Sequence, residues 1–368
     1  MSTMPSINNK VIVACAGSGK TTYIVDEALK LRNKRILITT YTVENLDQIE
    51  TYFIEKNGCV PSDVSIQTWF SFLFQDGARP YQNYMTDRGR VQSINFLEPG
   101  KALRYVPETE DSHYLTEKNY LYKDKVSKFA CKCDEKSNGL VVRRLAKIYD
   151  YIFIDELQDF AGWDLNLLEA LFKSGIVIIA VGDPRQATFS TNNSSKNNQY
   201  RKSDVYLWLK EKEKFKNIVI EEKIDCHRCN QQICNFSDNL FPDLPKTKSM
   251  NNCVTGHDGI YWMKQGNVSE YISKYKPTVL RFSKATKTMD LSAINIGLSK
   301  GRTYDRVLIF ATKPMQKYLE TADLTKAGDK IKLYIAVTRA RYSAAFVVSD
   351  VKSIKNNLSQ VWLNRDAT

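Results

Sequence analysis

A short glycine-containing segment near the N-terminus has the composition of a phosphate-binding loop. The segment Ala14-Cys-Ala-Gly-Ser-Gly-Lys-Thr21 follows the apolar run Val11–Cys15 and leads into the amphipathic stretch Lys20–Leu31. Glycines let backbone N–H groups approach a phosphate chain, a helix N-terminus adds partial positive charge, and a lysine reaches the terminal phosphate oxygens. We therefore predict nucleotide binding by Ala16, Gly17, Ser18, Gly19, Lys20, Thr21 and Thr22, with the Thr21 hydroxyl also a ligand of Mg²⁺.

Two adjacent carboxylates follow a second apolar run. Asp155 and Glu156 come directly after Tyr151–Ile154. A strand that delivers two carboxylates at its end places one on a metal ion and leaves the next to activate water. We predict that Asp155 holds Mg²⁺ and that Glu156 is the general base. An acidic turn after a buried strand is the structural alternative, and the phosphate loop favours the catalytic interpretation.

Three more polar residues are candidates for contact with a nucleotide. Gln186 lies just after the run Gly175–Val181 and is placed to sense the γ-phosphate or the attacking water. Arg228 and Arg339 are candidates for stabilising the negative charge that develops during phosphoryl transfer. Taken singly, each arginine also fits an ordinary surface position.

The elements that position these residues form two series. The first contains short β-branched runs, typical of buried parallel strands, at Val11–Cys15, Arg35–Tyr41, Val64–Gln67, Tyr151–Ile154 and Gly175–Val181. The second contains similar runs at Asn217–Ile220, Gly259–Met263, Thr278–Phe282, Ala293–Ile296, Arg306–Phe310 and Ala344–Val348. Segments long enough for crossover helices separate several of these strands, which predicts an α/β fold with parallel sheets flanked by helices.

The spacing of these runs predicts the domain organisation. We expect a first domain over residues 1–72 and 150–215, an inserted subdomain over 73–149, and a second domain over 216–368. The tract 191–199 is polar and predicts a loop. The charged run 210–216 predicts a solvated helix face.

Composition favours an acidic partner. The 368 residues include 53 Lys and Arg against 41 Asp and Glu, a net charge of +12, with 20 Tyr, 16 Phe and 5 Trp. Positive charge and aromatic rings together suit a nucleic acid, whose bases stack on rings. No apolar run approaches the roughly 18 residues of a membrane span, and the eight cysteines fit a reducing compartment. We expect a cytoplasmic protein without a membrane partner.

Four residues have the types and local spacings of a zinc site. They are Cys226, Cys229, Cys253 and His257. Buried free thiols are the commoner reading of such cysteines, and we favour it.

Eight blocks together resemble the ordered motifs of UvrD/Rep-like helicases of superfamily 1. In chain order they are Ala14–Thr22, Thr39–Asn45, Thr68–Phe72, Asp155–Asp159, Gly182–Phe189, Cys226–Cys229, Ser299–Val307 and Tyr334–Arg341. The resemblance implies two RecA-like domains that hydrolyse ATP with Mg²⁺ in the cleft between them and move along single-stranded DNA, typically 3′ to 5′.

The resemblance also implies roles for individual residues. Gln186 would couple the γ-phosphate to the DNA site, and Arg228 and Arg339 would be arginine fingers. Lys300 and Gly301 fall in a block that touches both nucleotide and DNA. The residues that match positions along the DNA path are Tyr41, Thr68, Trp69 and Phe189, with core packing as the alternative for Trp69 and Phe189.

The chain departs from the pattern of this family at several places. The ten residues before Val11 contain no glutamine to read adenine. Past Phe189, where the family usually has an aromatic residue, an arginine and Gly-Ala, the chain has Thr191, Asn192, Asn193 and Ser194, so that a base-stacking ring and a polar contact are lost. Phe70 replaces a common histidine, and Thr303 replaces a glutamate. Only 65 residues lie between Cys229 and Asn295, too few for the large accessory subdomain of the family.

Two functions follow from this pattern. The first is an ATP-dependent DNA helicase or translocase acting on single strands or on junctions with duplex. The second is a nucleotide-switched ATPase subunit of a DNA repair or antiviral defence complex, with a partner such as a nuclease. A small-molecule kinase is disfavoured because it does not need Gln158, Gln186 and Arg339.

Overall fold

The computed structural model describes residues 9–96, 106–188, 190–192, 194–214, 218–349 and 359–362. The chain forms two compact units. One unit comprises Met1–Val13 and Lys20–Glu221, and the other comprises Ala14–Gly19 and Glu222–Thr368, so that the phosphate loop groups with the second unit.

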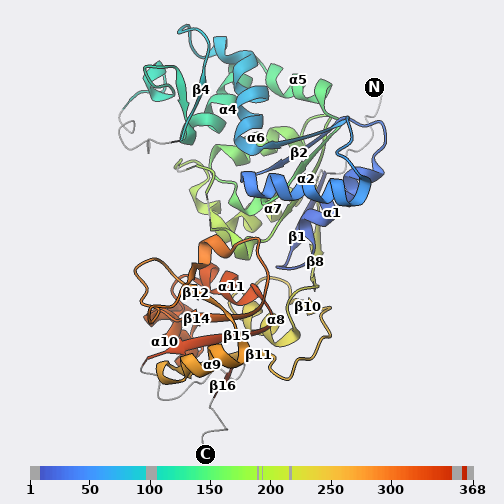
Figure 1. Ribbon diagram of the computed structural model, residues 1–368. Helices are drawn as coiled ribbons and strands as arrows, with labels where there is room; N and C mark the ends of the chain where they lie inside the picture. Colours follow the sequence, from blue (N-terminus) through green and yellow to red (C-terminus); the bar gives the residue numbers. More distant parts are fainter. Residues whose placement is uncertain are drawn as a thin grey trace, which may run out of the picture. The chain divides into compact units, whose positions relative to one another are not determined.

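The first sheet has six strands in the order β3–β2–β6–β7–β1–β8. Its strands β1, β2 and β8 are labelled in Figure 1. The strands are β1 (Asn9–Ala14), β2 (Ile36–Thr40), β3 (Val64–Thr68), β6 (Tyr151–Ile154), β7 (Val177–Gly182) and β8 (Ile218–Lys223). The neighbours from β3 to β1 are parallel, with Leu37 opposite Ile152 and Val11 opposite Ala180. The carboxyl ends of these strands therefore meet at one edge, which is where ligands bind in open α/β sheets.

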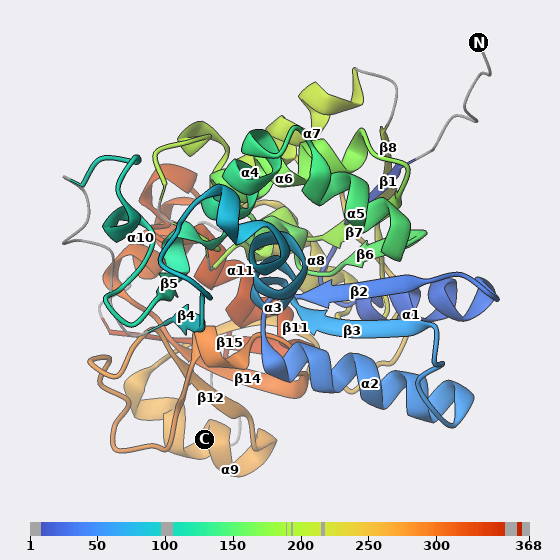
Figure 2. The same ribbon diagram turned by 90° about the horizontal axis from the view of Figure 1, so that it is seen from above.

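Helices cover both faces of this sheet, as Figure 2 shows with α2 on one side of β2 and β3 and with α5 and α6 on the other. The helices of this unit are α1 (Lys20–Lys30), α2 (Val43–Asn57), α3 (Trp69–Phe72), α4 (Val126–Lys136), α5 (Leu140–Ile148), α6 (Trp163–Phe172) and α7 (Val205–Glu213). Local sequence sets the ends of α2: Thr42 accepts a hydrogen bond from the Asn45 N–H, and Gly58 ends the helix at a φ of 81°.

The inserted segment packs on the first unit. It continues α3 through a π-helical turn (Leu73–Ala78) and contains two three-residue parallel strands, β4 (Ser93–Asn95) and β5 (Tyr120–Tyr122). The buried α4 residues Phe129 and Ala130 belong to the same core cluster as Leu37 and Ile152 of the sheet. The insertion is thus anchored by burial of apolar surface.

The second sheet is parallel at all its described pairings, in the order β13–β12–β14–β15–β11–β16. The strands are β11 (Gly259–Lys264), β12 (Thr278–Arg281), β13 (Ile294–Asn295), β14 (Tyr304–Phe310), β15 (Ala340–Val348) and β16 (Ser359–Val361). A separate pair joins β9 (Asp225–Cys226) to β10 (Lys248–Ser249), and the helices are α8 (Gln231–Asp238), α9 (Val268–Tyr275), α10 (Lys313–Thr321) and α11 (Lys330–Thr338). The predicted α/β class with two parallel sheets is confirmed.

One predicted strand belongs to the other sheet. The run Asn217–Ile220 was expected to open the second series, but β8 lies beside β1 at the edge of the first sheet. Strand propensity is a local property, whereas the choice of sheet edge depends on pairing with β1, about 200 residues earlier. None of the helices in the described part of the chain is long and apolar enough to cross a membrane.

Candidate nucleotide-binding site

The phosphate loop connects β1 to α1 and contains two residues whose backbone conformation only glycine adopts readily. Gly17 and Gly19 have φ values of 75° and 74°. The Ser18 hydroxyl donates a hydrogen bond of 2.8 Å to the Cys15 carbonyl and closes the turn. A Cβ atom at Gly17 would lie 2.6 Å from the Cβ of Arg228, so close approach also requires glycine here. The predicted order of strand, glycine loop and helix is present.

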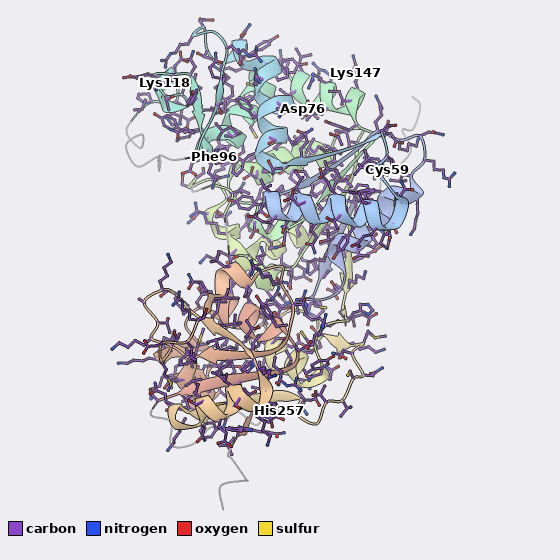
Figure 3. All side chains as sticks on the ribbon, in the orientation of Figure 1. Cys59, Asp76, Phe96, Lys118, Lys147 and His257 are labelled. Carbon is purple, nitrogen blue, oxygen red and sulfur yellow. The ribbon has the colours of Figure 1, made fainter. Side chains whose placement is uncertain are left out.

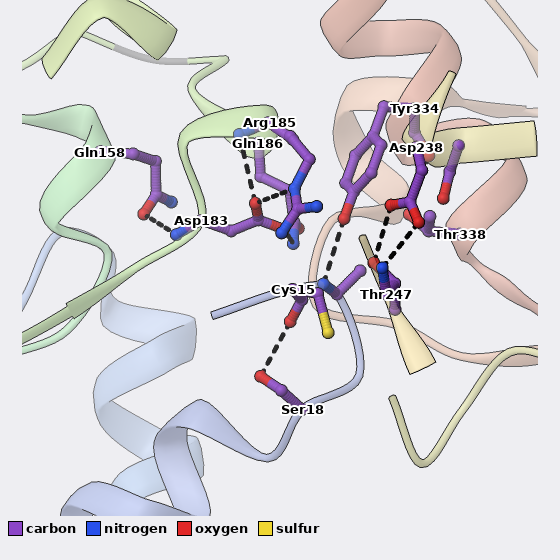
Figure 4. A network of polar contacts seen from close by, with 12 residues as sticks. Cys15, Ser18, Gln158, Asp183, Arg185, Gln186, Asp238, Thr247, Tyr334 and Thr338 are labelled. Atoms are coloured by element: carbon purple, nitrogen blue, oxygen red, sulfur yellow. Dashed lines mark hydrogen bonds and ion pairs between the residues drawn. The ribbon is translucent and has the colours of Figure 1, made fainter. Parts of the chain in front are cut away.

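The phosphate loop is held by other residues of its own unit, the second. The Ala16 N–H donates a hydrogen bond of 3.1 Å to the Tyr334 hydroxyl, as Figure 4 shows, and the His227 N–H donates one of 2.9 Å to the Gly17 carbonyl. Sequence reasoning did not single out Tyr334, although it lies in a motif block, because nothing in the block indicates contact with a loop 318 residues away.

Asp155 is buried directly beyond β6, beside the start of α1. The Thr21 hydroxyl donates to Asp155 Oδ2 at 3.1 Å, and the Glu156 N–H donates to Asp155 Oδ1 at 2.8 Å. Burial, together with the nearby Glu156 charge, raises the Asp155 pKa to about 6, while Lys20 opposes the rise.

The oxygens of Thr21 and Asp155 fit Mg²⁺. Magnesium prefers hard oxygen ligands and takes only one or two from protein, the rest coming from phosphates and water. Over the described residues no group of three or more His, Cys, Asp or Glu could hold a metal ion. Binding of Mg²⁺ by Thr21 and Asp155 stays a prediction.

Glu156 is held by Gln158, a motif residue for which the sequence predicted no positioning role. It adopts a left-handed backbone (φ 58°, ψ 40°), a conformation that costs energy for a residue with a side chain. The Gln158 amide donates to Glu156 Oε2, and Gln158 Oε1 accepts a hydrogen bond of 2.9 Å from the Asp183 N–H. Gln158 therefore ties the carboxylate beyond β6 to the end of β7. Its place in the Asp-Glu-x-Gln-Asp block was the available clue.

Gln186 is oriented by a buried carboxylate at the end of β7. Asp183 accepts hydrogen bonds from Gln186 Nε2 at 2.8 Å and from Arg185 Nε at 2.9 Å (Figure 4). Burial disfavours ionisation of Asp183, but the charges of Arg185 and Lys20 outweigh it and hold its pKa below the usual value. The first unit thus brings Thr21, Asp155, Glu156 and Gln186 together through hydrogen bonds that link the first turn of α1 to the ends of β6 and β7.

The two candidate arginines lie at the C-terminal end of α11. Arg228 is half-buried and donates a hydrogen bond of 3.1 Å to the Thr338 carbonyl. Arg339 is 1% exposed and donates to the carbonyls of Ile335 and Arg302. Arg302 follows Lys300 and Gly301, so Arg339 connects α11 to that predicted nucleotide block.

Among the described residues, the four that we considered as a zinc site do not form a cluster that could hold a metal ion. Cys226 and Cys229 are buried in the core of the second unit, and Cys253 is exposed. His257 is stacked between the rings of Tyr261 and Tyr275 at 4.0 and 3.8 Å, and burial, helped by the Arg306 charge, lowers its pKa to about 4. Cys226, Cys229 and His257 therefore serve packing in the second unit.

The predicted nucleic-acid residues separate into three groups. Tyr41 directly follows β2, and Thr68 ends β3, where its hydroxyl accepts the Ser71 N–H as the N-cap of α3. Phe189 lies outside the described residues. Trp69 is 0% exposed and packs against Phe160 with ring centroids 4.4 Å apart, which favours the core-packing alternative for this residue.

A buried polar network explains the position of Trp69. Its indole N–H donates to Asp164 Oδ1 at 2.7 Å, and the Asn192 amide donates to Asp164 Oδ2 at 2.8 Å. Thr191 Oγ1 accepts from the Ala161 N–H at 2.9 Å. The residues that replace the usual DNA contacts, Thr191 and Asn192, are therefore used for internal packing rather than exposed in a loop.

We expect Asn192→Ala to lower the free energy of unfolding by about 1–3 kcal/mol, because it leaves one oxygen of the buried Asp164 carboxylate without this donor. The urea midpoint, followed by circular dichroism, measures the effect. The exposed Asn198→Ala serves as a matched control and should change stability by less than about 0.5 kcal/mol. Equal midpoints for Asn192→Ala and wild type would contradict the structural role of the network.

Comparisons with known proteins agree with this organisation. Residues 3–192 match the family model described as an AAA domain, and residues 135–348 match the model described as the viral superfamily 1 RNA helicase core domain. A search of curated proteins found no match.

Similar solved structures include viral helicases. A crystal structure of arterivirus nonstructural protein 10 (helicase) matches with a TM-score of 0.49 and 13% sequence identity, over 92% of this chain and 59% of that chain. The structure of the PRRSV helicase matches with a TM-score of 0.42 and 14% identity, over 93% of this chain and 52% of that chain. The complex of arterivirus nonstructural protein 10 with DNA matches with a TM-score of 0.49 and 13% identity, over 95% of this chain and 62% of that chain. The chain thus spans between half and two thirds of the length of these structures.

Proposed function

The chain belongs to the superfamily 1 helicases, and we propose that it is an ATPase of the UvrD/Rep type that moves along single-stranded DNA from 3′ to 5′. The observation that carries this proposal is a hydrogen-bonded set in the first turn of α1 and just beyond the ends of β6 and β7. Its members are Thr21, Asp155, Glu156, Gln158, Asp183 and Gln186. This set matches the residues that an ATP-hydrolysing site needs at one sheet edge.

Each side chain has a step that its position supports. Lys20 and the loop N–H groups bind the phosphates, and Asp155 and Thr21 would hold Mg²⁺ beside them. When bound, Mg²⁺ neutralises charge on the phosphate oxygens. Glu156, fixed by Gln158, accepts a proton from the attacking water. Gln186, held by Asp183, senses the γ-phosphate.

Further motif residues have proposed roles. Arg228 and Arg339 supply positive charge to the transferred phosphoryl group. Lys300 and Gly301 contact nucleotide and nucleic acid. Tyr41 and Thr68 remain in the proposed nucleic-acid path.

A second candidate is the nucleotide-switched subunit of a DNA repair or antiviral defence complex, with a nuclease as partner. The burial of Trp69 and Asn192 favours it, because both positions are lost to nucleic-acid contact. In this role ATP occupancy, rather than translocation, would carry the signal.

The deciding measurement is the ATP hydrolysis rate with and without single-stranded oligonucleotide, with Lys20→Ala as the blank for contaminating activity. We expect a rate that DNA stimulates strongly. RNA belongs in the same series because the matched family model describes RNA helicases. Stimulation by RNA but not by DNA would identify RNA, rather than DNA, as the polymer along which the chain moves. A hydrolysis rate that neither polymer changes would favour the nucleotide-switched subunit.

A further inference from the structure

The inserted segment brings two of its side chains beside the ends of β2 and β3. Tyr41 directly follows β2, and Phe70 lies in α3, the short helix that directly follows β3. From the insertion, Phe96 follows β4 and Lys123 follows β5. These four residues all belong to the first unit, and we call them the aromatic platform.

The rings of the platform form a continuous row. Tyr41 and Phe70 have ring centroids 5.8 Å apart, and Phe70 meets Phe96 edge to face at 5.7 Å and 88°. The Lys123 Nζ lies 5.3 Å from the Phe70 ring centroid and 5.7 Å from that of Tyr41, and donates a hydrogen bond of 3.2 Å to the Tyr41 hydroxyl. One ammonium group is therefore fixed over two of the three rings.

Exposure differs sharply along this row. Phe70 is 6% exposed and belongs to the core, whereas Phe96 is 58% exposed. Phe70 thus supports Phe96 from beneath, and most of the outer ring remains in contact with water. Figure 3 labels Phe96 on the inserted segment.

A supported, exposed ring beside an ammonium group has the chemistry that single-stranded nucleic acid requires. A base of any sequence stacks on an aromatic face, and the neighbouring phosphate pairs with a lysine. An ammonium has three donors, and within the described residues Lys123 uses one of them on Tyr41, so it has donors for a phosphate oxygen.

We propose that Phe96 and Lys123 extend the nucleic-acid path from the motif residues Tyr41 and Phe70 onto the inserted segment. One base stacks on Phe96, and Lys123 contacts an adjacent phosphate. This inference rests on the proposed function, since it assumes that the chain binds a single strand. It also gives a role to Phe70, which replaces the histidine common at this position, because a ring at this site supports Phe96.

The test is binding of a fluorescein-labelled oligothymidylate to the full chain, followed by fluorescence anisotropy over a range of salt concentrations. Phe96→Ala should raise the Kd about 5- to 150-fold, and Phe96→Tyr should bind like wild type because it keeps a ring. Lys123→Ala should weaken binding and lower the slope of log Kd against log salt concentration by about 1, the change expected for the loss of one phosphate contact.

Two variants of the same inserted segment are matched controls. Tyr84 is 46% exposed and Lys118 lies in an exposed loop (Figure 3), so Tyr84→Ala and Lys118→Ala should bind like wild type. Circular dichroism checks that each variant is folded.

The outcomes separate this inference from the proposed function. If wild type binds the oligonucleotide and both Phe96→Ala and Lys123→Ala bind equally well, the platform is wrong and the proposed function stands. If wild type does not bind single strands and its ATP hydrolysis ignores them, both proposals fail. Loss of binding in Phe96→Tyr as well as Phe96→Ala would also overturn stacking as the role of Phe96.

Discussion

Replacement of Glu156 by glutamine is expected to lower the ATP turnover of the chain about 10²- to 10⁴-fold, the usual contribution of a general base. The amide has nearly the shape of the carboxylate but cannot take a proton from water. Gln158 already fixes one Glu156 oxygen, and the Asp183 N–H fixes Gln158 in turn, so the replaced side chain should stay near the same position. The loss should therefore be chemical rather than structural.

Binding and hydrolysis should separate in this variant. Lys20, Thr21 and Asp155, which we assign to the phosphates and the cation, are unchanged, so ATP affinity measured by fluorescence titration should stay close to wild type. Glu55→Gln, at an exposed position of α2, controls for the change of charge and should hydrolyse ATP normally. Turnover of Glu156→Gln within threefold of wild type would exclude Glu156 as the base.

Arg228→Ala should reduce stimulated ATP turnover about 10³-fold, at the lower end of the range known for arginine fingers. The guanidinium stabilises charge that grows on the phosphoryl group in the transition state, so the loss should fall mainly on kcat. Arg228 is half-buried and bonds to the Thr338 carbonyl, whereas Arg339 is fully buried and holds two carbonyls. Replacement of Arg228 therefore tests the proposed catalytic role with a smaller loss of folding stability than replacement of Arg339.

The control for this experiment lies two residues from Arg339. Arg341 is exposed and pairs with Asp305 at 3.0 Å, so Arg341→Ala removes a positive charge from the same region without touching the proposed chemistry. Its turnover should match wild type, and Arg228→Lys should recover only part of the activity because an ammonium lacks the planar fork of the guanidinium. Equal turnover of Arg228→Ala and Arg341→Ala would remove Arg228 from the catalytic set.

The sequence alone determined those parts of the site that local patterns encode. Tyr151–Ile154 was predicted with the bounds that β6 has, because a short apolar run before two carboxylates has strong boundaries. The phosphate loop was identifiable from its glycines, because its backbone needs positive φ values that few other residues adopt. Most other strands of both sheets, being buried runs of β-branched residues, were also readable within a few residues.

Only the tertiary structure decided which distant residues meet. It placed β8 in the first sheet, buried Trp69 against Asp164 and Asn192, and brought Tyr334 to the phosphate loop. It also gathered Phe96 and Lys123 beside Tyr41 and Phe70. The sequence alone does not show whether an aromatic or amide side chain packs in a core, joins a hydrogen-bond network or lies on the surface. Its role is set by the free energy of pairing and burial across long separations, which no local window contains.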